Sequence, residues 1–142
     1  MFVNDTVRNV GTSLLGRKMY EVMKAWDDIP TEGVGGPMDG PSPAMNDCAA
    51  IWRAQKKIVY STSLSGVTIA NATLERAFDA SAVQKLVAVS DKDFAIGGPH
   101  LAAEAIKAGI VDEYHQIIAP IMIGSGNPWL PKDVTVKLAL QD

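Results

Sequence analysis

Two adjacent glycines, Gly97 and Gly98, separate an apolar run from a pattern typical of a helix. The run Phe94–Ile96 predicts a buried strand, and Pro99 suits the first helical turn, where its missing N–H has no partner to lose. Glycines allow a sharp turn and the close approach of another molecule, and a helix start attracts anions. The pattern therefore predicts either a phosphate cradle or an ordinary turn. The cradle would consist of Ile96, Gly97, Gly98, Pro99, His100 and Leu101.

A second junction of this kind follows the apolar pair Leu14-Leu15. Gly16 ends that short strand, and apolar residues then recur at helical spacing as far as Trp26. The first helical residues, Arg17 and Lys18, offer a planar fork and a point charge to phosphate oxygens. The alternative is that both side chains are simply solvated on the helix surface.

A third strand, Ile58–Tyr60, ends in a cluster of hydroxyl groups. Its β-branched and aromatic residues favour a strand. The hydroxyls belong to Ser61, Thr62 and Ser63. They suit hydrogen bonds to a polar ligand, and they equally suit an ordinary turn.

The composition narrows the class of protein. With 142 residues, 47% of them hydrophobic, the chain is long enough for a single globular domain over residues 1–142. The net charge of −3 argues against a nucleic-acid partner. The single cysteine, Cys48, and two distant histidines give no expected metal site and fit a reducing compartment. We find no membrane span and no signal peptide over Met1–Arg8, so we expect a cytoplasmic protein with a small-molecule substrate.

Other elements are expected from periodicity and from helix caps. Helices are predicted from Asn46 or Asp47 to Gln55 and from Pro99 to Lys107, with Gly109 as the C′ residue. Part of Leu74–Ala88 is also expected to be helical, with Asp79-Ala80-Ser81 as a candidate break. Extended segments are predicted over Thr68–Ala70, Ile110–Ile123 and Val134–Leu140. The glycine- and proline-rich segment Ile29–Pro43 is expected to be a long loop of undetermined role.

Alternating strands and helices predict an α/β fold: a three-layer sandwich with a mostly parallel central sheet and helices on both faces. Ligands of such sheets bind beside the carboxyl ends of the strands. The strand ends after Leu15, Tyr60 and Ile96 are therefore expected to line one crevice. Together they favour a nucleotide ligand.

Several motifs, taken in order, resemble the dihydrofolate reductase-like proteins. Leu15–Glu21 resembles their G-R-x-T/M-W/Y-E motif, Val59–Ser63 their V-x-S strand end, and Ile96–Gly98 their I-G-G turn. Val111–Tyr114 and Pro120–Gly126 are similar to segments of the C-terminal reductase domain of the bifunctional riboflavin-biosynthesis deaminase/reductase. The resemblance covers nearly the whole chain.

This resemblance implies NADPH as the cofactor. It assigns contacts with the pyrophosphate and the 2′-phosphate to Gly16, Arg17, Lys18 and Met19. It assigns the surroundings of the adenosine to Ser61, Thr62 and Ser63. Gly97 and Gly98 would lie against the nicotinamide and pyrophosphate, with His100 and Leu101 opening the helix behind them.

The resemblance further implies an oxidoreductase, a homodimer, and hydride transfer to a pterin-, pyrimidine- or ribosylaminopyrimidine-like substrate. Relatives carry one strand before the segment that starts at Met1 and one after the segment that ends at Asp142, so we expect the sheet to lack its first and its C-terminal strand. No catalytic residue is assigned. Two alternatives stay open: an inactive nucleotide-binding or structural remnant of the fold, and a domain for a flavin or another nucleotide.

Overall fold

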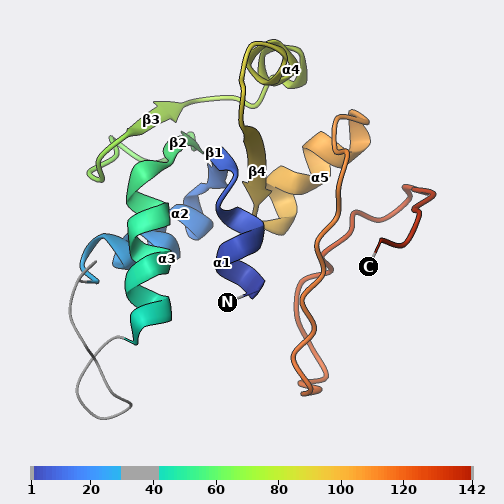
Figure 1. Cartoon of the computed structure of the whole chain (residues 1–142). Coiled ribbons are helices and arrows are strands. Elements are labelled where there is room, and N and C mark those ends of the chain that lie inside the picture. Colours follow the sequence, from blue (N-terminus) through green and yellow to red (C-terminus); the bar gives the residue numbers. More distant parts are fainter. Residues whose placement is uncertain (1, 30–41, 142) are drawn as a thin grey trace.

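A computed structural model describes residues 2–29 and 42–141 of the chain (Figure 1). Most of the expected loop Ile29–Pro43 lies outside these residues. In chain order the elements are α1 (Phe2–Val7), β1 (Val10–Gly16), α2 (Arg17–Met23), the 3₁₀-helix η1 (Lys24–Asp27), α3 (Pro43–Ala54), β2 (Lys56–Tyr60), β3 (Ala72–Glu75), α4 (Ala80–Ala88), β4 (Asp93–Gly97) and α5 (Pro99–Lys107).

The four strands form one sheet in the order β3-β2-β1-β4. All three pairings are parallel, which confirms the predicted α/β class. β1 has a partner on each side, as β2 does, and the β1 residues Thr12, Ser13, Leu14 and Leu15 are all buried. A strand buried on both faces needs this nearly continuous run rather than an alternating one.

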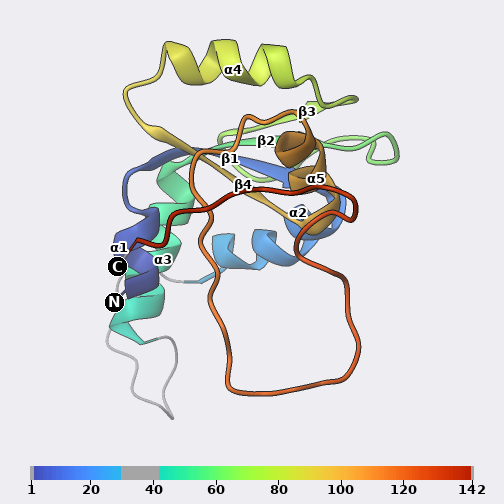
Figure 2. The same cartoon turned by 90° about the vertical axis from the view of Figure 1, so that its right-hand side faces the viewer.

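Helices cover both faces of the sheet. Leu15 packs on one face with buried residues of α2, α3 and β2. Its neighbour Leu14 faces the other side, where it lines a cavity with Val83 of α4 and Ala105 of α5. Figure 2 shows α4 on one side of the sheet and α2 and α3 on the other. Each fully buried apolar side chain contributes about 1.5–3 kcal/mol to stability.

The ends of α5 follow the prediction. Pro99 is in its first turn, and Gly109 adopts a φ of 67°, which favours glycine. The N–H of Gly109 donates to the carbonyl of Ile106 at 3.0 Å, and the N–H of Ile110 to that of Ala105 at 3.2 Å. These two bonds complete a Schellman motif and end the helix where the sequence indicated.

The start of α3 differs from the prediction. Ser42 caps the helix, because its hydroxyl accepts the N–H of Met45 at 3.3 Å. The expected caps lie inside the helix instead. Asp47 accepts hydrogen bonds from Arg8 at 2.9 Å and from Asn4 at 2.8 Å, so it ties α3 to α1. The carboxylate of Asp47 therefore makes a tertiary contact instead of capping the helix.

The segment before α4 also differs. Only the part of Leu74–Ala88 that follows the candidate break at Asp79 is helical, because Leu74 lies in β3 and pairs with Val59 of β2. Asp79 caps the shorter helix, with its carboxylate accepting the N–H of Ser81 at 2.9 Å. The predicted extended piece Thr68–Ala70 is not a strand. The strand begins at Ala72 because β2 offers its edge there.

Residues 108–141 form neither helix nor strand, so the strands predicted over Ile110–Ile123 and Val134–Leu140 are wrong. A strand needs a partner for its backbone groups. A cavity of about 560 Å³ lies between β4 and residues 110–115, and the two segments do not pair. Figure 2 shows the segment as a wide open loop beside the sheet. We call residues 108–141 the C-terminal segment.

Among the residues that the structure describes, one charged side chain is buried in the core. Lys57 on β2 is 1% exposed, and its Nζ lies 4.6 Å from the centre of the Trp52 ring. Its ammonium donates to the carbonyl of Arg53 at 3.4 Å, close to the end of α3. Burial lowers the pKa of Lys57 from its ordinary value of 10.5, and the carboxylate of Asp27 partly opposes that shift. The folded state therefore holds this proton less tightly than the unfolded chain does.

This difference predicts a pH dependence of stability. Because the unfolded chain binds the proton more tightly, the free energy of unfolding rises as the pH increases from the lowered pKa of Lys57 toward 10.5. Lys57→Met should remove this rise and stabilise the protein at neutral pH. Urea unfolding of both proteins between pH 7 and 10.5 measures it, with the exposed neighbour Lys56→Met as the control. An unchanged alkaline slope in Lys57→Met would contradict the prediction.

Candidate nucleotide site

Three strand ends meet at one edge of the sheet. In the parallel register Gly16 lies beside Tyr60, and Leu15 lies beside Gly97. Ser61, which follows Tyr60 directly, is therefore at the same edge. The structure thus brings together the three chain reversals that the sequence singled out. Ligands of parallel sheets bind at this edge.

The glycines at this edge differ in what the fold requires of them. Gly98 has a φ of 95°, a conformation that side chains disfavour. Gly16 has φ −76° and ψ 163°, which any residue adopts, and a Cβ there would be 3.9 Å from the Cβ of Leu101. A Cβ at Gly97 would meet only ordinary contacts, the nearest being 3.5 Å to Met19. The folded chain therefore has room for a methyl group at Gly16 and Gly97.

The three residues after Gly16 have different surroundings. The guanidinium of Arg17 donates to both carboxylate oxygens of Glu21, at 2.9 and 3.0 Å, and the side chain is 41% exposed. Lys18 is exposed. Met19 lies against the glycine pair, with its Cβ 3.6 Å from where a Cβ of Gly98 would be. Met19 thus joins α2 to the end of β4, while both cations stay at the surface.

The hydroxyl cluster divides into a structural and an exposed part. Ser61 is buried, and its hydroxyl accepts the N–H groups of Ser63 at 3.2 Å and Leu64 at 3.1 Å. It therefore shapes the turn. Thr62 and Ser63 are exposed at the strand end and remain accessible to a ligand.

Arg76 is a residue of this edge that the sequence analysis missed. Its guanidinium donates to the carbonyls of Ser61 at 3.0 Å and Leu64 at 2.6 Å. It follows Glu75, the last residue of β3, which pairs with Tyr60. The signal was present as an arginine after a short alternating strand, but the segment was read as helical.

The start of α5 has no side-chain cap. Its first turn contains Pro99, His100 and Leu101 after the extended Ile96, and His100 is exposed. Early helical N–H groups have no partner within their own helix. This helix start therefore retains donors for an anion, at the same edge as Gly16 and Arg17.

Tyr60, the last residue of β2, places an aromatic ring at this edge of the sheet. Its ring meets that of Phe78 edge-on, with 5.4 Å between ring centres. Burial raises the pKa of Tyr60, and the carboxylates of Glu75 and Asp79 raise it further. The phenol therefore stays neutral at physiological pH.

Two further searches cover the part of the chain that the structure describes. No group of three or more histidine, cysteine, aspartate or glutamate side chains that could hold a metal ion was found there. Within those residues, no helix is long and apolar enough to cross a membrane.

The sheet order and the gathered strand ends define a protein of the dihydrofolate reductase-like class. The chain belongs to the RibD C-terminal domain family, whose pattern matches residues 1–142. A search among curated proteins found no match. The family is one of reductase-like domains of riboflavin biosynthesis, which supports an oxidoreductase at the level of class.

Arg76 is predicted to hold the turn after β2 closed. Arg76→Met removes both carbonyl contacts. The amide hydrogens of Ser63 and Leu64 should then exchange with solvent about tenfold faster, because the free energy lost is roughly that of one net hydrogen bond. Hydrogen exchange followed by NMR measures this. Lys85→Met, on the surface of α4, is the control. Equal protection in Arg76→Met and wild type would show that the arginine does not hold the turn.

Proposed function

We propose that this chain is an NADPH-dependent reductase. Its substrate is pterin-, pyrimidine- or ribosylaminopyrimidine-like, as for a 5-amino-6-(5-phosphoribosylamino)uracil reductase. Family membership supports the reaction class. NADPH as the cofactor is supported by the free space at Gly16 and Gly97. At these two positions neither the backbone conformation nor a neighbouring atom requires glycine. A side chain is missing where another molecule needs to approach.

The residues at this edge suit a dinucleotide diphosphate. Arg17 and Lys18 supply positive charge for a 2′-phosphate, and the first N–H groups of α5 suit the pyrophosphate. The hydroxyls of Thr62 and Ser63 suit the adenosine end. NADPH, when bound, supplies the hydride. The chain's own part is to bind and orient the cofactor and to exclude water.

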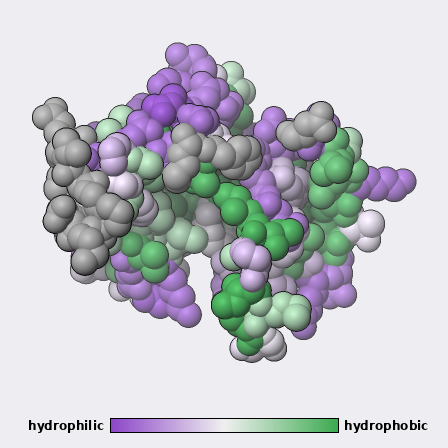
Figure 3. Space-filling view, turned by 60° about the horizontal axis from the view of Figure 1, so that its bottom comes forward, coloured by the Kyte–Doolittle hydropathy of each residue, from purple (hydrophilic) through white to green (hydrophobic). Residues whose placement is uncertain are grey.

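The wider setting follows from the same proposal. We propose one domain over residues 1–142, acting in the cytoplasm, in line with its single cysteine. We also propose a homodimer, as the resemblance implies, because the C-terminal segment exposes large apolar side chains (Figure 3).

Gly16→Ala separates cofactor binding from folding. The added methyl group meets only Leu101 at 3.9 Å, so the free energy of unfolding should change by less than about 0.5 kcal/mol. If the cofactor lies against this glycine, NADPH affinity should fall at least about tenfold, because close-packed interfaces do not admit an extra methyl group. Tryptophan fluorescence titration measures the affinity. Gly66→Ala, where a Cβ meets nothing within 4 Å, is the matched control.

Arg17→Ala tests the cofactor's 2′-phosphate. Removing the guanidinium should weaken NADPH about 10- to 100-fold and leave NADH nearly unchanged, since only NADPH carries that charge. Paired titrations with both nucleotides measure the preference. Lys24→Ala removes an exposed cation from η1 and should alter neither affinity. Equal losses for NADPH and NADH would contradict the assigned role.

The alternative is an inactive nucleotide-binding or structural remnant of the same fold. The Arg17–Glu21 ion pair favours it to a degree, because the arginine already has a partner. Turnover assays distinguish the two: saturable NADPH binding without substrate reduction supports the remnant. A wild-type protein that binds neither NADPH nor NADH overturns the cofactor proposal.

A further inference from the structure

α2, the helix that carries Arg17 and Lys18, is too short to be stable by itself. It has seven residues, and no side chain caps its first turn. Isolated helices shorter than about 12–15 residues are marginal in water, so contacts with the rest of the fold must hold α2 in place. Tyr20 is the one residue of α2 that is buried, with 4% of its surface exposed. The placement of α2 on the sheet therefore depends largely on the surroundings of Tyr20.

The ring of Tyr20 lies in the core, and its hydroxyl reaches a distant part of the chain. The ring belongs to the buried cluster that also contains Leu15, Trp52 and Val59. The hydroxyl oxygen accepts the backbone N–H of Thr68 at 2.9 Å and lies 3.2 Å from the Oγ1 of the same residue. Tyr20 thus joins α2 to the segment between β2 and β3.

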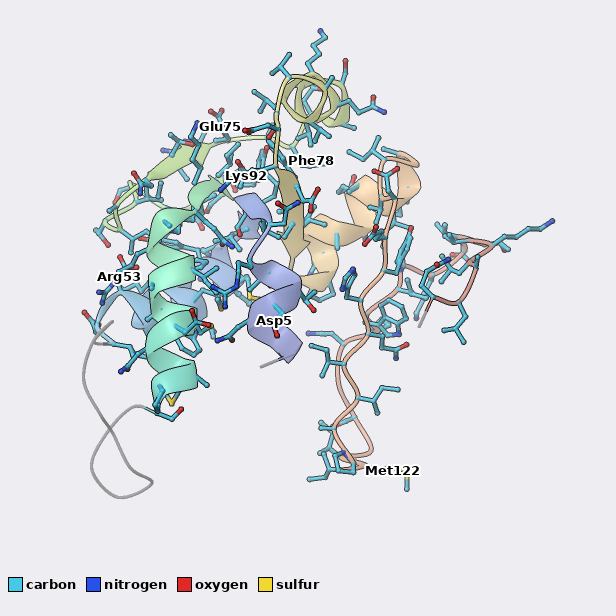
Figure 4. The ribbon with its side chains drawn as sticks, in the orientation of Figure 1. Asp5, Arg53, Glu75, Phe78, Lys92 and Met122 are labelled. Carbon is cyan, nitrogen blue, oxygen red and sulfur yellow. The ribbon has the colours of Figure 1, made fainter. Side chains whose placement is uncertain are left out.

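We call residues 61–71 the β2–β3 loop. The sheet fixes both of its ends. The N–H of Ser61 donates to the carbonyl of Glu75 at 2.9 Å, and the N–H of Lys57 donates to the carbonyl of Asn71 at 2.8 Å. Glu75 is labelled in Figure 4, at the end of β3. The loop is therefore tied to two strands of the sheet.

Between these ends, side chains supply the hydrogen bonds to the loop backbone. Within the described part of the chain, the backbone of residues 62–70 is bonded by Ser61 and Arg76 near its start and by Tyr20 at Thr68. Three apolar side chains of the loop pack against the core cluster that contains the Tyr20 ring: Leu64, Val67 and Ile69. Because its ends and its apolar side chains are held, the loop is a firm anchor for the Tyr20 hydroxyl.

The orientation of α2 decides where its cations lie. Arg17 precedes Tyr20 by three positions, which is almost one helical turn. A rotation of about 10° moves a side chain on a helix of about 5–6 Å radius by about 1 Å. Charge-assisted hydrogen bonds to phosphate need about 2.7–2.9 Å between the heavy atoms, so a displacement of that size weakens them.

We propose that Tyr20 is a positioning residue for the phosphate end of the nucleotide site. The bond between its hydroxyl and Thr68 fixes the rotation of α2, and the helix in turn places the guanidinium of Arg17. Tyr20 therefore acts through Arg17. The inference rests on the proposed NADPH-dependent function and adds a buried residue to the set that selects NADPH.

The first test measures nucleotide affinity in Tyr20→Phe, which removes the hydroxyl and keeps the ring. NADPH affinity should fall about fivefold, since about one net hydrogen bond no longer holds α2. NADH affinity should change less than about twofold, because NADH lacks the 2′-phosphate. In an Arg17→Ala background, Tyr20→Phe should change NADPH affinity less than about twofold. Tyr114→Phe, the same substitution in the C-terminal segment, is the matched control and should alter neither affinity.

The second test follows hydrogen exchange by NMR without any nucleotide. The amide hydrogen of Thr68 and those of α2 should exchange about fivefold faster in Tyr20→Phe than in wild type. Unchanged exchange at these amides overturns the inference.

The two tests also separate this inference from the proposed function. If wild type binds NADPH and Tyr20→Phe loses equal affinity for NADPH and NADH, or loses none, the positioning role is overturned and the cofactor proposal stands. A wild type that binds neither nucleotide overturns the cofactor proposal and this inference with it.

Discussion

The parallel pairing of β1 with both of its neighbours is the constraint on which the rest of this structure depends. It buries β1 on both faces and on both edges, and it directs three strands to end at one rim. Because the register places Gly16 beside Tyr60 and Leu15 beside Gly97, three turns that are distant in sequence lie at the same edge of the sheet. A register shift of one residue would turn Leu14 and Leu15 to the wrong faces.

The glycines of the chain serve three different purposes. At Gly98 and Gly109 the backbone adopts a positive φ, so the fold itself selects glycine. At Gly11 a Cβ would lie 2.7 Å from the Cβ of Lys92, so a neighbouring side chain selects it. At Gly16 and Gly97 neither reason applies. These two positions carry the proposed cofactor contact, and they lie on the rim that the parallel pairing creates.

Two sides of the sheet have different chemistry. The rim at the strand ends has cations, hydroxyls and free helical N–H groups, which suit a small anionic ligand. The side of β4 has an apolar floor and carboxylates. The C-terminal segment lies beside the second of these sides and exposes large apolar side chains.

The sequence by itself determined the elements whose causes are local. The apolar run of β1, the glycine pair after β4, and the proline and glycine that bound α5 act within a few residues, so their patterns were readable. Only the tertiary structure decided what depends on distant partners. Leu74 became part of a strand because β2 offered an edge, whereas residues 110–123 form none and a cavity separates residues 110–115 from β4. Arg76 joined the candidate site for the same reason: pairing between strands, which no local pattern encodes, set its position.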